Sequence, residues 1–361
     1  MRFPEFSGEW EKVLLSSACE INPKTGSLDN QFLYIDLESV VKGSLVKRQI
    51  IEKDGAPSRA QRVLKENDIL YQCVRPYQLN NFIFEGDTIQ CVASTGYAQL
   101  RTTQFPLYIF QALHTKQFTN QVLERCTGTN YPAINSSDLG TVEVPICSLP
   151  EQVKIGSLLA LIDSRIKTQS KIIEEHETLL KSLADKLFLQ NNHSCQLSEL
   201  VKIVKGKQIN ADTLSETGDY YVMNGGITPS GYYSEYNVPA GAISISEGGN
   251  SCGYVQFNEK PFWSGGHCYS LQCRTNLVDY KYIYYFLKTK EADVMALRIG
   301  SGLPNIQKKD IEKFTISYPS LQLQKQFVKA LDALSGKINT EINLLEKYCQ
   351  QKSYLLAQMF I

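Results

Sequence analysis

The feature that most constrains this chain is a long helical pattern that occurs twice. Between residues 151 and 189, apolar residues recur at the seven-residue spacing of a coiled-coil seam, with no proline in the run. When the sequence is shifted by 172 positions, residues 323–361 carry the pattern in the same register. Because one such helix cannot bury its apolar stripe alone, the two copies are predicted to pack together. The predicted seam residues are Ile155, Leu159, Ile162, Ile166, Ile173, Leu180 and Leu187 in the first copy and Phe327, Leu331, Leu334, Ile338, Leu345, Leu355 and Met359 in the second.

The repeat also includes the segments that precede the two helices. Residues 128–139 align with residues 300–311 at the same shift. Within the helices, Lys352 opposite Leu180 is the one clear mismatch. Self-similarity at a fixed period identifies a duplicated architecture, so the sequence predicts a pseudo-twofold internal repeat with an offset of 172 residues. The identical pairs before the helices are Gly128 and Gly300, Pro132 and Pro304, Ile134 and Ile306, and Asp138 and Asp310.

The duplication divides the chain into two globular parts, each followed by one helix. A chain of 361 residues is long for a single core, and short strand patterns separated by turns predict a mixed α+β (α/β) fold. The ends of the two globular parts are alike and their middles are not, which predicts two binding units that recognise different things. The expected boundaries are 1–148 and 193–318 for the globular domains, and 149–192 and 319–361 for the helices. Expected strands are 32–36, 68–72 and 141–145, and expected helices follow Pro106 and cover 281–289.

The sequence contains no recognisable catalytic motif. It lacks a GxxxxGK[ST] phosphate loop, a GxGxxG fingerprint after a strand, and the aromatic–Asp/Asn–Pro–Pro cluster of amino-methyltransferases. His267, Cys268 and Cys273 have no second close pair, which favours buried thiols over a metal site. We therefore expect no catalytic residues, no cofactor and no metal in this chain.

Charge and cysteine usage limit the class of partner. Lys+Arg and Asp+Glu are both 37, whereas a free-standing non-specific DNA binder is usually basic. If the chain binds DNA, other chains should supply much of the phosphate contact. The ten cysteines form no CxxC pair, and no signal peptide or long apolar run is present, which predicts a cytoplasmic protein without a membrane partner.

Glycine-rich turns and scattered polar side chains are the candidates for contact with DNA. Residues 247–251 could cradle an anion, but the strand patterns at 243–246 and 254–257 favour a β-hairpin whose tip can still touch DNA. For the loops 128–132 and 300–305, a glycine–proline turn that only directs the next strand is an equally good interpretation. The candidate DNA contacts are Arg59, Arg62, Arg75, Asn130, Tyr131, Asn224, Asn250, Ser301 and Asn305.

The first domain ends in GTNYPAIN (128–135) and VPICSLPEQ (144–152) and is followed by a long seam helix, and this arrangement is repeated once. It resembles the specificity (S) subunit of type I restriction-modification enzymes. The resemblance covers the whole chain and is most specific over 128–189 and 300–361. It implies two target-recognition domains, each recognising one half of a split double-stranded DNA site. It also implies two antiparallel coiled-coil helices that set the spacing and dock two methyltransferase subunits. Methyl donor and ATP would belong to partner chains, so the subunit itself would not be catalytic, and restriction (translocase-nuclease) subunits are a further candidate partner.

Two alternatives stay open from the sequence. The chain could be the recognition portion of a single-chain restriction-methyltransferase system, against which the absence of any methyltransferase or nuclease motif argues. It could also be a coiled-coil protein-interaction scaffold with no role on DNA. A generic coiled coil gives no reason for the duplicated glycine–proline segment, which argues against the scaffold.

Overall fold

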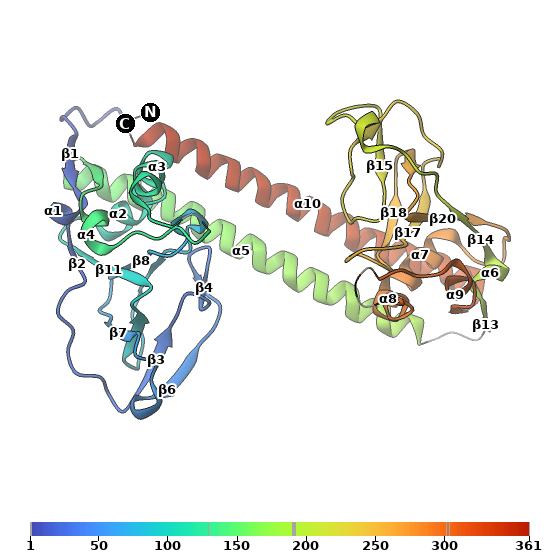
Figure 1. Cartoon of the computed structure of the whole chain (residues 1–361), viewed down its shortest axis with the longest axis horizontal. Helices are drawn as coiled ribbons and strands as arrows, with labels where there is room; N and C mark the ends of the chain where they lie inside the picture. Colours follow the sequence, from blue (N-terminus) through green and yellow to red (C-terminus); the bar gives the residue numbers. More distant parts are fainter. Residues whose placement is uncertain (1, 129, 190–192, 301, 303, 361) are drawn as a thin grey trace. The chain divides into compact units, whose positions relative to one another are not determined.

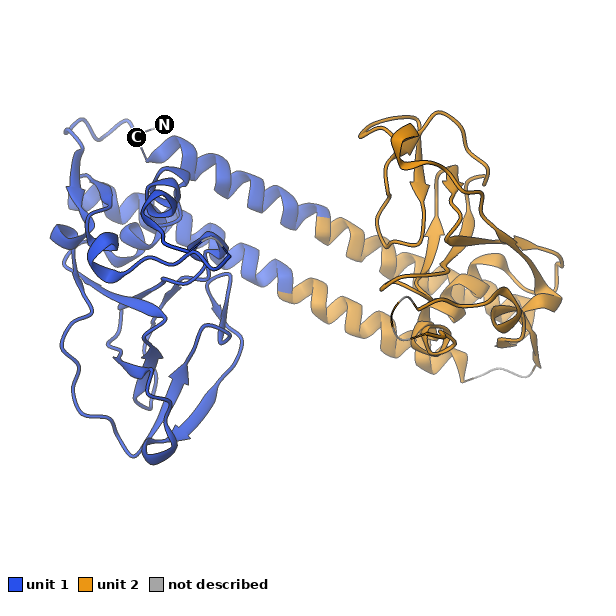
Figure 2. Cartoon of the chain, in the orientation of Figure 1, with its two compact units in different colours: residues 1–170, 343–361 blue, residues 171–342 orange. Residues whose placement is uncertain are grey.

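The structure, a computed structural model, describes residues 2–128, 130–189, 193–300, 302 and 304–360. It divides into two compact units (Figure 2): unit 1 comprises residues 1–170 and 343–361, and unit 2 comprises residues 171–342. Two long helices, α5 (Leu149–Phe188) and α10 (Leu321–Met359), each contribute one half to each unit. None of the described helices combines the length and the apolarity needed to cross a membrane.

Unit 1 contains two four-stranded sheets. The main sheet has the order β2–β11–β8–β9, and every residue of its central strand β8 is buried. In the second sheet, of order β6–β3–β10–β7, β10 pairs parallel with β3 and antiparallel with β7. Helix α2 begins at Pro106, where the missing amide costs no helical hydrogen bond. The elements of unit 1 are β1 (Glu11–Leu14), α1 (Leu15–Ala18), β2 (Cys19–Ile21), β3 (Gln31–Ile35), β4 (Val40–Val41), β5 (Ser44–Leu45), β6 (Gln49–Glu52), η1 (Lys53–Gly55), β7 (Ala60–Val63), β8 (Ile69–Gln72), η2 (Pro76–Gln78), β9 (Phe82–Ile83), β10 (Cys91–Ser94), β11 (Tyr97–Thr102), α2 (Pro106–Ala112), α3 (Lys116–Arg125), α4 (Ser136–Gly140) and β12 (Glu143–Ile146).

Unit 2 repeats the main sheet with the order β14–β20–β17–β18, again with a fully buried central strand, β17. Its second sheet has three strands in the order β16–β15–β19, with β15 and β19 parallel. Most of its elements are labelled in Figure 1. They are β13 (His193–Gln196), α6 (Leu197–Leu200), β14 (Val201–Lys205), η3 (Ala211–Thr213), β15 (Tyr220–Met223), β16 (Tyr232–Tyr233), β17 (Ala242–Ser246), β18 (Val255–Asn258), β19 (Phe262–Ser264), β20 (Cys268–Cys273), α7 (Tyr280–Thr289), α8 (Glu291–Ala296), α9 (Lys308–Glu312) and β21 (Thr315–Tyr318).

The internal repeat extends further than its sequence signal. The two main sheets share their strand order, and each second sheet contains one parallel pair. The main sheets thus extend the likeness from the ends of the globular parts, where the sequence predicts it, into their middles, while the second sheets differ, with four strands in unit 1 and three in unit 2. Buried strands require apolar side chains rather than particular ones, so the pairing scheme persists after the residue identities have diverged.

A buried glutamine fixes the start of each long helix. In unit 1 the Gln152 side chain donates to the carbonyl of Cys147 at 2.8 Å and accepts from the amide of Phe105 at 3.1 Å. In unit 2 the Gln324 side chain donates to the carbonyl of Pro319 at 2.8 Å and accepts from the amide of Asp279 at 2.7 Å. Both glutamines are almost fully buried, so each bridge connects the first turn of the helix to the chain before it and to the start of α2 or α7.

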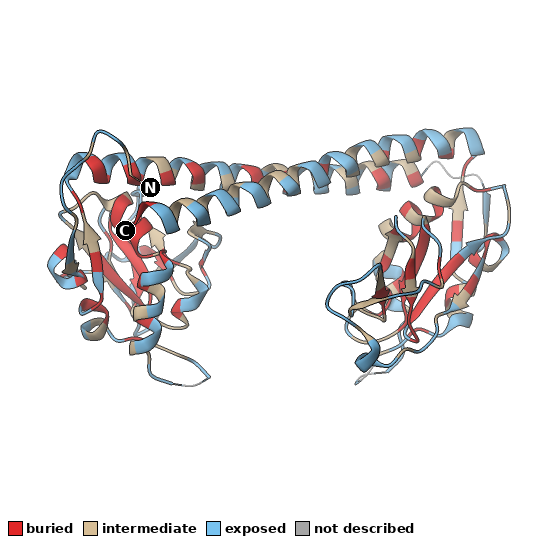
Figure 3. Ribbon diagram, turned by 90° about the horizontal axis from the view of Figure 1, so that it is seen from above, coloured by how far each residue is buried: buried red, intermediate tan, exposed pale blue. Residues whose placement is uncertain are grey.

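The predicted seam residues are all buried or half-buried (Figure 3), and each lies within one unit. In unit 1, Ile155 and Leu159 near the start of α5 share a core with Met359 at the end of α10. In unit 2, Leu187 near the end of α5 packs against the core that contains Phe327 near the start of α10. The two helices therefore run antiparallel, as predicted.

Lys352, the mismatched residue of the seam, has a partner within unit 1. Its ammonium group forms an ion pair with the carboxylate of Asp163 on α5. The carboxylate also accepts a hydrogen bond of 2.7 Å from the side-chain amide of Gln111 on α2. Lysine is tolerated in the apolar stripe because its charge is compensated across the helix pair.

An aromatic contact joins the last turn of each long helix to its globular part. The ring centroid of Phe360 lies 5.2 Å from that of Tyr108, and the ring of Phe188 lies 5.4 Å from that of Tyr282. The two tyrosine hydroxyls donate to the backbone carbonyls of Pro145 and Ser317, at 2.8 and 2.9 Å. The duplication thus reproduces individual side-chain contacts as well as the course of the chain.

Candidate nucleic-acid interface

The segments that precede α4 and α9 form the same closed loop in both units. We call residues 127–133 and 299–305 the lead-in loops. Thr127 and Ala133 exchange two backbone hydrogen bonds of 2.9 Å, and Ile299 and Asn305 exchange two of 2.8 and 3.0 Å. Gly128 and Gly300 have φ values of +90° and +99°. Only glycine adopts this backbone conformation at little cost, which explains why the glycine is present in both copies.

Each lead-in loop is bound to the end of the central strand of its main sheet. In unit 1, the amide of Arg75 donates to Pro132 O at 2.7 Å, and the amide of Ile134 donates to Cys73 O at 3.0 Å. In unit 2, the amide of Gly249 donates to Pro304 O at 3.0 Å, and the amide of Ile306 donates to Glu247 O at 2.8 Å. These bonds bring the chain after β8 or β17 together with the loop, and with them several of the predicted DNA contacts.

In unit 1 the loop carries an exposed aromatic side chain beside an arginine. Tyr131 is 65% exposed, and the guanidinium carbon of Arg75 lies 4.3 Å from the centroid of its ring. Arg75 has a φ of 54°, a left-handed conformation that is unfavourable for arginine and that directs the chain out of β8. Asn130 is exposed in the same loop. A planar guanidinium held on an aromatic face is suited to contact bases or phosphates.

The other two predicted arginines of unit 1 lie at strand β7. Arg59 is exposed in the turn that leads into the strand, and its carbonyl accepts a hydrogen bond of 2.9 Å from the amide of Thr95. Arg62 lies within the strand and is half-buried, and burial lowers the pKa of its guanidinium.

In unit 2 the end of β17 carries a buried carboxylate. Glu247 is 7% exposed; its Oε1 accepts a hydrogen bond of 2.8 Å from the hydroxyl of Tyr269 and lies 2.7 Å from the ammonium group of Lys205. The Nδ1 atom of His267 is 3.8 Å from Oε2. Burial, and then the neighbouring carboxylate, raise the pKa of Tyr269. The tyrosine is therefore a neutral hydrogen-bond donor that holds Glu247 in place.

The glycine pairs of unit 2 meet around this carboxylate. A Cβ atom on Gly225 would lie 3.1 Å from the Cβ of His267, and one on Gly265 would lie 2.5 Å from Oδ1 of Asn224. Asn224 Oδ1 also accepts a hydrogen bond of 3.1 Å from the amide of His267. The glycines are required because three turns approach each other closely, and they leave polar side chains as the accessible groups.

The remaining predicted contacts of unit 2 lie in the turn after β17 and in the lead-in loop. The strands β17 and β18 pair antiparallel, with Ile245 opposite Val255, which confirms the predicted hairpin. Asn250 is exposed in its turn, and Asn305 is exposed where the lead-in loop closes. Ser301 lies outside the described residues. No group of three His, Cys, Asp or Glu among the described residues could hold a metal ion.

The charged members of the unit 2 cluster are not predicted from the sequence. Lys205 ends strand β14, and Glu247, 42 residues later, directly follows strand β17. Neither shows any local pattern that distinguishes it from an ordinary surface residue. Only the pairing of β14 and β17 with β20 brings the two side chains together.

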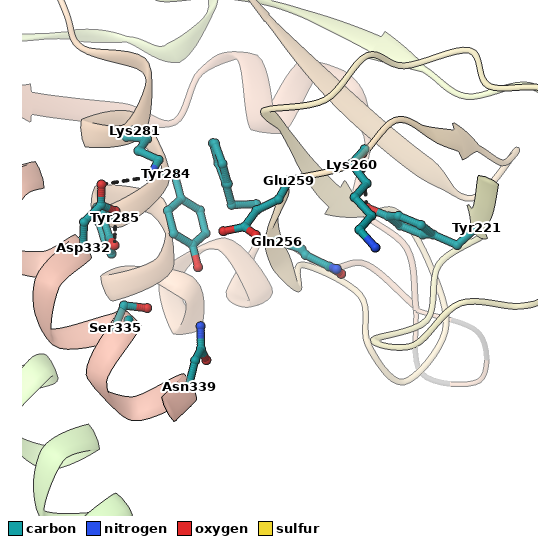
Figure 4. A pocket seen from close by; sticks show the side chains of 12 residues that line it. Tyr221, Gln256, Glu259, Lys260, Lys281, Tyr284, Tyr285, Asp332, Ser335 and Asn339 are labelled. Carbon is teal, nitrogen blue, oxygen red and sulfur yellow. Dashed lines mark hydrogen bonds and ion pairs between the residues drawn. The ribbon is translucent and has the colours of Figure 1, made fainter. Parts of the chain in front are cut away.

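Unit 2 also contains a polar cavity of about 610 Å³ between β18, α7 and α10 (Figure 4). On its helical side, the carboxylate of Asp332 accepts a hydrogen bond of 2.7 Å from the hydroxyl of Tyr285 and forms an ion pair of 2.8 Å with Lys281. These charges compensate each other and connect α7 to α10. The arrangement explains how the globular part is attached to the helix.

Comparison with known proteins places this geometry in a family. Residues 7–178 and 191–347 match the family model described as the type I restriction modification DNA specificity domain. A putative type I specificity subunit of Mycoplasma genitalium is 26% identical over 270 residues, which cover 70% of each chain. A putative type I specificity subunit of Mycoplasma pneumoniae is 33% identical over 152 residues, covering 42% of this chain and 40% of that protein. The crystal structure of the type I restriction-modification S subunit from M. genitalium has the same fold, with a TM-score of 0.72 at 20% identity over 98% of this chain and 96% of that one. Because the family model matches both halves of the repeat, this chain belongs to the type I restriction modification DNA specificity domain family.

Proposed function

We propose that this chain is the DNA sequence-specificity subunit of a type I restriction-modification complex. Each globular domain recognises one half of an asymmetric, bipartite site on double-stranded DNA. The observation that carries this proposal is the repeated lead-in loop, bound to the same strand end in both units but surrounded by different side chains. A duplicated support with unlike side chains is what two different half-sites require.

Base recognition in the two units is expected to use different chemistry. In unit 1, Arg75 can donate two hydrogen bonds to a guanine edge, and Asn130 and Tyr131 lie beside it. In unit 2, Asn224, Asn250 and Asn305 carry amides suited to an adenine edge. Ser301, Arg59 and Arg62 are further candidate contacts.

The helices are proposed to separate the two recognition domains and to dock the partner chains. The proposed domains are 1–148 and 193–318, with the spacer helices at 149–192 and 319–361. Several apolar side chains on the helices are exposed and available for protein contact, including Leu161, Leu179 and Tyr354, each more than half exposed. Two methyltransferase subunits would bind there and supply the basic surface that the balanced charge of this chain does not.

The chain itself is proposed to be non-catalytic. Adenine methylation, and ATP-dependent cleavage where restriction subunits also bind, would be carried out by the partner chains. The contribution of this chain is to position those active sites on one sequence by binding energy alone.

The test is to purify the chain with and without the methyltransferase subunits of its own system and to measure binding to random-sequence DNA. We expect a stable complex that selects a bipartite sequence. A complex that assembles but has no affinity for any DNA would support a protein-interaction scaffold instead. Methyl donor bound to the isolated chain in native mass spectrometry would support an enzyme.

A further inference from the structure

A cavity of about 550 Å³ opens on unit 1 between the segment 22–28 and strand β7. Its lining includes two cationic residues, Lys24 and Arg62, and contains no aspartate or glutamate. Thr25 and Gln61 add a hydroxyl and an amide. The cavity is thus bordered by hydrogen-bond donors and positive charge, without an acidic group of its own.

Among the residues that the structure describes, no aspartate or glutamate serves as a counter-charge for the guanidinium group of Arg62. Its Nε atom is buried and has no hydrogen-bond partner among the described residues. Arg101, by contrast, is a partly buried arginine of unit 1 that forms an ion pair of 2.7 Å with Asp68. Burial lowers the pKa of the Arg62 guanidinium, and the thiol of Cys73 offsets part of this effect. Removing a cation from water without an anion is unfavourable, so the site is arranged for an anion that arrives from outside the chain.

The wall opposite Arg62 is held open at both ends. Asn22 has a φ of 53°, its side-chain amide donates to the hydroxyl of Ser136 at 2.7 Å, and its Oδ1 accepts from the amide of Gln99 at 3.0 Å. At the other end, the side chain of Gln90 accepts from the amide of Asp29 at 2.9 Å and donates to Ser27 O at 3.2 Å. These bonds fix the course of the segment between them, so that the cavity does not depend on a ligand to form.

We propose that this cavity binds one phosphate of the DNA backbone, held by Arg62 and Lys24. The proposal rests on the proposed function and deepens it. A guanidinium fork donates two parallel hydrogen bonds to phosphate oxygens, and Lys24 adds a point charge. Arg62 lies opposite Ala93 of β10, and three residues later the carbonyl of Gly96 accepts a hydrogen bond of 3.0 Å from the amide of Cys73, so a short stretch of backbone connects the phosphate site to the strand end that carries the lead-in loop. Phosphate contacts fix the position of a protein on the duplex and carry no sequence information directly.

In unit 2 the place of strand β7 is taken by Asn237 and Val238, which bond antiparallel to Phe262 of β19, and the segment 231–241 around them contains no lysine or arginine. The phosphate site therefore belongs to unit 1 alone. We expect it to set the register of unit 1 on DNA, while the side chains around the lead-in loop select the bases.

The experiment uses the complete complex with its methyltransferase subunits and compares Arg62→Gln, Arg62→Lys and wild type over a range of salt concentrations. For Arg62→Gln we expect the slope of log K against log salt to decrease by about 0.9, the loss of one phosphate contact. Affinity should fall equally for the cognate site and for sites altered in either half. Arg62→Lys should keep the slope and lose part of the affinity, because the charge remains without the fork.

Arg48→Gln is the matched control, since Arg48 is exposed and already forms an ion pair of 2.6 Å with Asp87. It should leave the salt slope unchanged. Thermal melts of each variant separate loss of contact from loss of fold. If Arg62→Gln is unstable, the test becomes the affinity of Arg62→Lys, which should fall equally for the cognate site and for sites altered in either half; unchanged affinity would then contradict the proposal.

Three results would overturn the proposal. An unchanged salt slope in folded Arg62→Gln would exclude a phosphate contact at this site. A change in which bases are preferred would make Arg62 a base-recognising residue. Stabilisation of the isolated wild-type chain, but not of Arg62→Gln, by inorganic phosphate, together with an unchanged slope on DNA, would assign the site to a free anion. Failure of the wild-type complex to bind any DNA would instead contradict the proposed function.

Discussion

In unit 1 and unit 2 the lead-in loop is bound at the same strand end, but the residue whose carbonyl accepts the hydrogen bond from the residue after the loop differs. In unit 1 it is Cys73, whose pKa burial raises to about 11, so that it is a neutral thiol, and the cation Arg75 follows two positions later. In unit 2 it is Glu247, a buried carboxylate held by Lys205 and Tyr269. The backbone of the duplicated scaffold sets where side chains are presented, and a few substitutions at the strand end reverse the local charge.

The contacts that attach the globular parts to the helices, in contrast to the strand ends, are the same in both units. Here the two copies retain the same contacts, including the buried glutamines and the tyrosine hydroxyls bonded to the strand before each helix. Constant attachment combined with variable strand ends allows one unit to be altered without disturbing the other. The predictions that follow test that independence.

The largest effect is expected from truncating the helix seam in one unit. Leu159 and Leu331 are both fully buried, in the cores of unit 1 and unit 2 respectively. Leu159→Ala and Leu331→Ala should each reduce the free energy of unfolding by about 2–5 kcal/mol. The two tryptophans, Trp10 in unit 1 and Trp263 in unit 2, report the two units separately by fluorescence.

We expect Leu159→Ala to shift the Trp10 transition and Leu331→Ala to shift the Trp263 transition. Leu161→Ala is the control, because Leu161 on the same helix is 55% exposed. Equal shifts of both transitions in either variant would mean that the two units unfold together. That result would contradict the independence of the two units in stability.

The next effect concerns the helix starts. Gln152→Ala leaves the amide of Phe105 and the carbonyl of Cys147 without their partner, and Gln324→Ala does the same to Asp279 and Pro319. Each should cost about 1–3 kcal/mol in its own unit, measured with the same tryptophan probes. If the loss in free energy of unfolding falls within this range for one variant and outside it for the other, the two bridges are not equivalent despite their matching geometry.

Glu247→Gln should act on recognition more than on folding. The amide keeps the size of the side chain and an acceptor for Tyr269, but it removes the charge that pairs with Lys205. Because Lys205 is more than half exposed, we expect a stability loss of only about 1 kcal/mol. The measurement is methylation of two DNA libraries, each randomised in one half-site. Discrimination between bases should weaken in the half-site that unit 2 recognises and stay unchanged in the other half-site.

The smallest effect is expected at the exposed loop of unit 1. Tyr131→Ala removes the ring beneath the Arg75 guanidinium, a contact worth about 0.5–1 kcal/mol at an exposed site. Affinity for the unit 1 half-site should fall by a few-fold, whereas Tyr131→Phe, which retains the ring face, should bind like wild type. Loss of affinity for the other half-site would show that the loop acts through the whole complex.

The parts of this account that the sequence predicted are those set by a periodic or duplicated pattern. The seven-residue spacing from Ile155 to Leu187 predicted the long helices, and the repeat of the glycine–proline segment predicted two equivalent domain ends. The hairpin around Asn250 followed from strand patterns on either side of a glycine pair. Each of these is a local signal that a single segment carries.

The contacts that the sequence did not predict depend on residues far apart in the chain. The Gln152 bridge joins three segments, and the Lys205–Glu247 pair spans two strands that do not pair directly with each other. The shared order of the main sheets was likewise hidden, because β8 and β17 satisfy the same burial with different residues. Tertiary pairing decides these features, and no spacing in the sequence encodes it.

The most direct test of the central claim is to map every methylated adenine that the reconstituted complex produces in a random DNA library. Two unlike units on one scaffold predict two different short motifs separated by an unrecognised gap of fixed length. Glu247→Gln should then alter the specificity in one motif only, and Tyr131→Ala should weaken only the other. A single uninterrupted motif, or a perfect palindrome, would contradict the claim that the two units recognise different halves of the site.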